Sequence, residues 1–107
     1  MLPKTLSGKA LRHLRGLGHA LDPVIAVGKA GVTDAVIAEA SKALERHELI
    51  KVRVLGEAPL DRKDAAEELA KATGAVLAQV LGRTFLLYKA HPKKPKIVLP
   101  KARITEG

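Results

Sequence analysis

Apolar residues recur at three- and four-residue spacing in three segments of the chain, which predicts three amphipathic helices. The first runs from Ser7 to Leu17, the second from Thr33 to about His47, and the third from Asp61 through Thr73. Each begins at a serine, threonine or aspartate, the residue types whose side chains cap a helix N-terminus. Gly74 suits the left-handed conformation that ends many helices.

Four shorter apolar segments predict strands. They are Val24 to Val27, Leu49 to Leu55, Ala75 to Leu81 and Thr84 to Tyr88. In the second segment, three aliphatic residues alternate with Lys51 and Arg53, so we expect one buried face and one basic face. Gly82-Arg83 predicts a tight turn that joins the last two strands into a hairpin.

The predicted order of elements is α-β-α-β-α-β-β. Strands separated by helices are normally parallel neighbours or near neighbours, and a tight turn makes an antiparallel pair. We therefore expect an α/β protein of the α+β two-layer type, with a mixed four-stranded sheet and three helices. The expected domain spans residues 4–99. After His91, lysines alternate with prolines, and residues 97–99 are expected to dock back on the domain. Residues 100–107 are expected to form a flexible basic tail.

The composition adds limits on the class of protein. The chain has 107 residues, enough for one domain with a modest core, and no cysteine, which excludes disulfides and thiolate metal sites. No uninterrupted apolar run exceeds four residues, so the sequence predicts no membrane helix and no cleavable signal peptide. The expected location is the cytoplasm.

Positive charge is concentrated at the two ends of the chain. Of the net charge of +8, residues 1–19 carry +4 and residues 89–107 carry +5, while the residues between them carry −1. A charge that only kept the protein soluble would be spread evenly, so basic ends indicate a polyanionic partner. Neither end pairs its charges with a bulky apolar face, which disfavours a membrane surface and favours nucleic acid.

Phe85 and Tyr88 are the only residues among Phe, Trp and Tyr. Modules that read single-stranded bases by stacking need several exposed rings. We therefore expect any nucleic-acid contact to involve phosphates and shape more than base identity.

The sequence contains no recognisable catalytic or cofactor motif. Ser7 and Ser41 are the only serines, and the four histidines are scattered without metal-ligand spacing. The phosphate-binding P-loop pattern and the dinucleotide fingerprint are both missing. No catalytic residue, metal site or cofactor is predicted, and a small enzyme is the least favoured interpretation.

The segment Gly28-Lys29-Ala30-Gly31 is the strongest candidate for a binding site. It follows a predicted buried strand and precedes a helix capped by Thr33, so its backbone N–H groups lie at the positive end of a helix dipole. Two glycines allow a sugar-phosphate backbone to approach closely, and Lys29 adds a charge, as in the backbone clamp of KH domains. A tight strand-to-helix turn that needs positive φ is an equally simple explanation of the spacing.

Basic side chains on two other elements extend the candidate site. They are Lys9, Arg12 and Arg15 on the first helix, and Lys51 and Arg53 on the second strand. No acidic residue precedes Asp22, which is unusual for an ordinary solvated helix face. Lys51 and Arg53 either continue a nucleic-acid surface or protect an exposed strand. Arg83 is expected to be exposed in either case.

Three motifs in this order resemble the CRM domain (chloroplast RNA splicing and ribosome maturation). They are Val27 to Thr33, His47 to Arg53 and Gly82 to Tyr88, and Leu14 to Pro23 fits the start of that domain. The match covers about residues 4–99, and a chain of this length is similar to the stand-alone bacterial YhbY-like proteins. Family members often carry two polar or basic residues between the two glycines of the loop. Ala30 departs from that pattern, so one side-chain contact with RNA would be missing and backbone contacts would contribute more to binding.

The resemblance implies a fold similar to the C-terminal domain of translation initiation factor three. It also implies RNA binding, with ribosomal RNA in precursors of the large ribosomal subunit as the partner and ribosome assembly as the role. Nothing demands more than a monomer. Two alternatives remain: an adaptor that binds an acidic ribosomal or translation protein, and a cofactor of group II intron splicing, as in plant relatives with several such domains.

Overall fold

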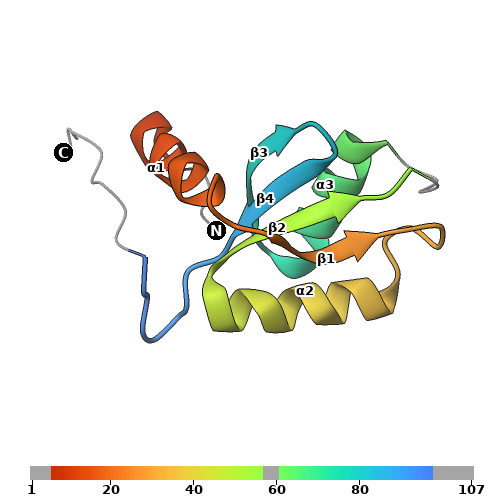
Figure 1. Cartoon of the computed structure of the whole chain (residues 1–107). Helices are drawn as coiled ribbons and strands as arrows, with labels where there is room; N and C mark the ends of the chain where they lie inside the picture. The colour runs from red at the N-terminus through yellow and green to blue at the C-terminus, as the bar shows by residue number, and fades with distance from the viewer. Residues whose placement is uncertain (1–5, 57–60, 98–107) are drawn as a thin grey trace.

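The computed structural model describes residues 6–56 and 61–97, which form three helices and four strands (Figure 1). In chain order they are α1 (Gly8–Gly18), β1 (Pro23–Val27), α2 (Asp34–His47), β2 (Leu49–Val54), α3 (Arg62–Thr73), β3 (Val76–Leu81) and β4 (Thr84–Tyr88). The predicted order of elements is confirmed. The expected boundaries at residues 4 and 99 and the expected tail at 100–107 lie outside the described residues.

The predicted caps are present at all three helices. The side chains of Ser7, Thr33 and Asp61 each accept a hydrogen bond from the backbone N–H three residues further on, at 2.9 to 3.1 Å. Gly74 ends α3 in the left-handed conformation, with φ of 73°. These ends are set by local sequence, because a cap needs only the few residues around it.

The four strands form one mixed sheet in the order β1-β2-β4-β3. β1 and β2 are parallel, and β4 is antiparallel to both of its neighbours, β2 and β3. The last strand of the chain therefore lies inside the sheet, between two strands that precede it. This order brings the β3–β4 turn beside the end of β2, where the backbone N–H of Val54 donates to the carbonyl of Arg83 at 2.7 Å.

α2 and α3 cover one face of the sheet, and α1 lies on the opposite face (Figure 1). The larger core lies under α2 and α3, and in β2 it receives Ile50, Val52 and Val54, as the alternation predicted. Lys51 and Arg53 are on the α1 side of the same strand. The sheet and the two helices α2 and α3 form the two expected layers, and α1 adds a partial cover to the other side.

α1 packs on a smaller cluster in which Leu14 meets residues from three strands. The strand residues are Leu49, Ala78, Leu86 and Tyr88. Gly18 allows this packing, because a Cβ at that position would collide with the side chain of Leu86. Leu49 begins β2 and Tyr88 ends β4, so α1 covers the part of the sheet where β2 begins. None of the three described helices covers the part of that face where β2 ends.

Candidate nucleic-acid interface

The Gly28–Gly31 loop is a compact turn between β1 and α2. The backbone N–H of Gly31 donates to the carbonyl of Gly28 at 2.9 Å, and that of Thr33 donates to the carbonyl of Gly31 at 3.1 Å. Lys29 and Ala30 are exposed at its tip. Among the described residues, the backbone N–H groups of Lys29 and Ala30 donate no hydrogen bond to the protein. The loop thus presents donors beside the N-terminus of α2, where the helix dipole favours an anion.

The two glycines of the loop have different reasons for being glycine. Gly31 has φ of 78°, a left-handed conformation that other residues adopt only with strain. Gly28 does not have positive φ, and a Cβ there would meet only Leu55, at an ordinary contact distance of 3.5 Å. The fold therefore requires Gly31, as the simple turn explanation expected. The fold would accept a side chain at Gly28, so folding does not explain the glycine at this position and leaves it open to a functional role.

Arg83 belongs to the same end of the molecule as the loop. The N–H of Leu55 donates to the carbonyl of Val27 at 2.9 Å, and β4 begins beside the end of β2. Arg83 is exposed on the β3–β4 turn, and its Nη1 lies 3.2 Å from the position of a Cβ built on Gly56. We call the part of the molecule formed by the Gly28–Gly31 loop, the end of β2 and the β3–β4 turn the loop end. The sequence placed Arg83 at an exposed turn, but only the strand order shows which loop lies beside it.

Lys51 and Arg53 lie on the open part of the sheet face. Arg53 is exposed and pairs with Ala26 of β1 and with Thr84 of β4. It precedes Val54, the residue paired with the last residue of β1, so it lies close to the loop end. Lys51 is half-buried nearer the middle of the sheet, where it lines a small hollow with Gly18 and His19 at the end of α1.

The basic residues of α1 lie away from the loop end. Lys9 and Arg12 are exposed on the helix, which packs where β2 begins (Figure 1). Arg15 is half-buried, and its Nε donates to the carbonyl of Ala78 at 3.0 Å, at an irregularity in the pairing of β3 with β4. Arg15 thus has a structural contact in addition to its charge. The predicted site residues therefore fall into two groups at different ends of the sheet.

Glu48 is a buried charged residue that the sequence analysis did not single out. It follows α2 with φ of 64°, and its side chain is fully buried. Its Oε2 accepts from the backbone N–H of His91 at 2.7 Å, and its Oε1 accepts from those of Lys96 at 2.8 Å and Ile97 at 2.7 Å. One carboxylate thereby holds three donors of the segment after β4. The signal available in the sequence was an acid between a helix and a strand, which does not identify its partners.

The hydrogen bonds decide the charge state of Glu48. Burial on its own would raise its pKa, but the backbone donors of His91, Ile97 and Lys96 outweigh burial and lower the pKa below the ordinary value of 4.5. Tyr88 shows the opposite shift, since burial and the nearby Glu48 charge raise the pKa of its hydroxyl. Glu48 is therefore ionised at neutral pH and fixed in place.

We call residues 89–97 the strap. The part of the molecule where the strap meets the end of α2 and the start of β2 is called the strap end. The strap continues from β4, where the N–H of Lys89 donates to the backbone carbonyl of Glu48 at 2.8 Å. Ile97 packs on the α1-side cluster, so the docking expected for residues 97–99 is confirmed at Ile97, and the other two lie outside the described residues. The lysine- and proline-rich segment after β4 is thus pinned to the fold as far as Ile97.

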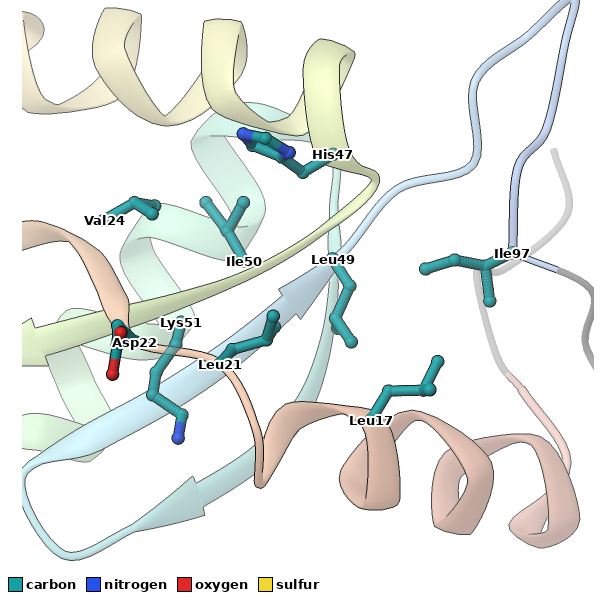
Figure 2. A pocket seen from close by; sticks show the side chains of 9 residues that line it. All are labelled: Leu17, Leu21, Asp22, Val24, His47, Leu49, Ile50, Lys51 and Ile97. Atoms are coloured by element: carbon teal, nitrogen blue, oxygen red, sulfur yellow. The ribbon is translucent and has the colours of Figure 1, made fainter.

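An apolar cavity of about 420 Å³ opens between α1, the starts of β1 and β2, and the strap (Figure 2). Leu17, Leu21 and Ile97 approach it from different segments, and Val24 lies at its border with β1. Leu17 and Val24 are 40% and 54% exposed, unusually high for large aliphatic residues. His47, Lys51 and Asp22 supply its polar lining.

Nowhere in ranges 6–56 and 61–97 do three or more potential ligand side chains gather where they could hold a metal ion. In the same ranges, no helix is long and apolar enough to cross a membrane. What the site has is exposed backbone donors at a helix N-terminus and separate groups of cations, an arrangement that can bind phosphate groups.

Comparison with known proteins agrees with the motifs. The model of the CRS1 / YhbY (CRM) domain matches residues 6–89. The chain is 44% identical over 95 residues to "Probable RNA-binding protein YqeI" of Bacillus subtilis, covering 89% of this chain and 99% of the relative. It is 38% identical over 97 residues to an "RNA-binding protein" of Haemophilus influenzae, covering 91% of this chain and 97% of the relative.

A solved structure shares the fold. The solution structure of the hypothetical protein SAV1595 from Staphylococcus aureus is similar with a TM-score of 0.76 and 40% sequence identity, covering 90% of this chain and all of that one. The family model spans every element from α1 to β4, including the Gly28–Gly31 loop and the β3–β4 turn. The chain therefore belongs to the CRS1/YhbY (CRM) domain family.

Proposed function

We propose that this chain is a non-catalytic RNA-binding protein that associates with precursors of the large ribosomal subunit and assists their assembly. The observation that supports it most is Gly28, whose missing side chain is not required by the fold. A bare backbone beside a helix N-terminus suits close approach of a phosphate. The names of the relatives support RNA as the partner.

In this proposal the loop end holds the RNA backbone in two ways. The N–H groups of Lys29 and Ala30 donate to phosphate oxygens, and the dipole of α2 adds to their attraction. Lys29, Arg53 and Arg83 supply positive charge around the same end of the sheet. Phe85 and Tyr88 are buried and offer no stacking platform, so structured RNA is bound by its phosphates and shape.

The role in ribosome assembly is tested by sedimentation of the tagged chain with cell lysate on a sucrose gradient. We expect comigration with large-subunit precursors that is lost after RNase treatment. The Gly28→Val chain should stay near the top of the gradient, while Ala38→Val, which adds bulk on the exposed side of α2, should comigrate normally. Comigration that survives RNase would favour the adaptor that binds a ribosomal protein.

A direct titration separates phosphate binding from base reading. The logarithm of the affinity for structured RNA should fall with the logarithm of salt concentration, by about 0.7 to 0.9 for each phosphate contact. Lys29→Ala should weaken different RNAs about equally. A loss confined to one RNA sequence would contradict the phosphate clamp.

A further inference from the structure

The strap end carries as much exposed positive charge as the loop end, and the charge is held in place there. Lys93, Lys94 and Lys96 are all exposed, on a segment whose backbone is bound to the buried carboxylate of Glu48 at both ends. A lysine-rich segment that served only solubility would not need a buried carboxylate to fix its course. Burying a charge is costly, so its three backbone partners indicate that the position of the strap matters.

Local hydrogen bonds shape the strap further. The Nδ1 of His91 accepts from the backbone N–H groups of Lys93 and Lys94, at 3.1 and 3.0 Å. These bonds form a turn that leaves both lysine side chains in solvent. The Nζ of Lys96 donates to the carbonyl of Arg46 at 3.1 Å, so this lysine lies over the end of α2.

α1 adds its charges to the same end of the molecule. Ile97 of the strap packs on the cluster that also holds Leu6 and Leu11 at the start of α1. The exposed residues Lys9 and Arg12 are therefore on the helix against which the strap docks. We call five exposed cations of these two segments the strap surface: Lys9, Arg12, Lys93, Lys94 and Lys96; Lys89 is also exposed, and its Nζ donates to the carbonyl of Thr73 at 2.8 Å.

The strap surface is too far from the loop to serve as its edge. β2 separates the two ends, and its six residues, each rising about 3.3 Å, place them more than about 15 Å apart. Glu45 is exposed on the last part of α2 and belongs to the strap end. The five cations exceed this acid, and Glu48 directs its charge at backbone donors instead of solvent. Within residues 6–56 and 61–97, the loop end and the strap surface are thus two separate cationic surfaces.

We propose that the strap surface binds a second segment of RNA, so that one copy of the chain holds two RNA segments together. This inference rests on the proposed function for the loop end. RNA suits the strap surface better than an acidic protein does, because its cations occur on two segments and none of them lines the apolar cavity between α1 and the strap. Phosphates need charge and spacing, whereas a protein interface needs an apolar centre. Linking the two sites raises the effective concentration of one RNA segment near the other.

Bridging is measured with two short RNA hairpins, one labelled with a fluorescent donor and the other with an acceptor. Each hairpin is kept short enough to occupy only one end of the protein. We expect energy transfer to rise as protein is added, to peak near one protein for two hairpins, and to fall in excess protein. The fall is the mark of a two-site bridge, because excess protein gives each hairpin its own copy.

Two variants remove one end at a time. Lys93→Ala combined with Lys94→Ala removes strap charge, and Lys29→Ala combined with Arg83→Ala removes loop charge. Each should lose at least half of the peak energy transfer while still binding one hairpin. Lys42→Ala, an exposed change on α2 outside both sets of cations, is the control for loss of charge and should bridge normally.

The outcomes separate this inference from the proposed function. One-to-one binding of a hairpin without energy transfer would overturn the bridge and leave RNA binding at the loop end intact. Absence of any hairpin binding would overturn the proposed function as well. Energy transfer that persists in the strap variant would mean that two copies of the chain bridge the hairpins, and it would overturn the inference. Loss of binding to an acidic protein in the strap variant, with RNA bridging unchanged, would do the same.

Discussion

The loop end and the strap end both present positive charge, but they are built differently. At the loop end, the Gly28–Gly31 loop and the β3–β4 turn are fixed by strand pairing and by a helix cap, and the proposed binding groups include backbone donors. At the strap end, a segment outside the sheet is held chiefly by the carboxylate of Glu48, and the proposed binding groups are side-chain cations. The loop end is therefore secured by the whole fold, while the strap end depends on Glu48.

This difference predicts where a single substitution has its largest effect. Glu48→Ala leaves three backbone donors without their acceptor and should lower the free energy of unfolding by about 3 kcal/mol, since bonds to a charged group contribute about 1.5 to 3 kcal/mol each and water replaces part of the loss. Urea unfolding measures the change. Glu48→Gln keeps the size and one acceptor oxygen, so its loss should be smaller. Equal stability of Glu48→Ala and the natural chain would show that the strap is not held by this carboxylate.

Acid should release the strap end before it affects the loop. The pKa of Glu48 is lower in the folded chain than the ordinary value of 4.5, so its ionised form contributes stability that is present above that pH and is lost as pH falls through the folded pKa. The loss should be smaller than in Glu48→Ala, because a protonated carboxyl still accepts hydrogen bonds. Urea unfolding between pH 7 and pH 3 should show a shallower acid dependence for Glu48→Gln. An identical pH dependence of the two chains would contradict this.

The two glycines of the loop should respond in opposite ways to the same change. Gly31→Ala places a side chain at φ of 78° and should lower the free energy of unfolding by about 1 to 2 kcal/mol. Gly28→Ala meets only Leu55 at 3.5 Å and should leave stability within about 0.5 kcal/mol of the natural chain. Thermal unfolding and RNA titration of both variants test this contrast. Weaker RNA binding by Gly28→Ala at unchanged stability would support close approach of RNA to the backbone at Gly28. Unchanged affinity would mean that the loop is only a strand-to-helix turn.

The smallest expected effect belongs to Arg83. Its side chain is exposed, so Arg83→Ala should leave stability unchanged while RNA affinity falls about three- to tenfold and the salt dependence loses about one phosphate contact. Lys71→Ala, an exposed change on α3, serves as the control for loss of one charge. If the Arg83→Ala chain had the same salt dependence as the natural chain, Arg83 would not contact an RNA phosphate.

What the sequence predicted depends on how local each feature is. The caps at Ser7, Thr33 and Asp61 were predicted because each needs only the next three residues. The face of Lys51 and Arg53 followed from alternation within one strand. The sequence did not reveal that Arg83 lies beside the Gly28–Gly31 loop, since that depends on β4 pairing with β2.

Longer-range contacts were also beyond sequence reasoning. Glu48 is 43 to 49 residues away from the backbone groups that it binds. The contact of Arg15 with Ala78 spans 63 residues. Neither has a spacing that a local pattern can reveal, and the same is true of the position of α1 relative to the loop. The glycine spacing and the position before a capped helix singled out the loop as a candidate, and strand pairing showed which cations share its end of the molecule.

The central position of β4 also sets the order in which the chain can finish folding during synthesis. β2 and β3 have no direct pairing, and both wait for Thr84–Tyr88 to join them. That strand also supplies Phe85 and Leu87 to one core and Leu86 and Tyr88 to the other. A nascent chain that stops before residue 84 therefore lacks the piece shared by both cores. The sheet therefore closes only after residues 84–88, the last of the four strands, have been made.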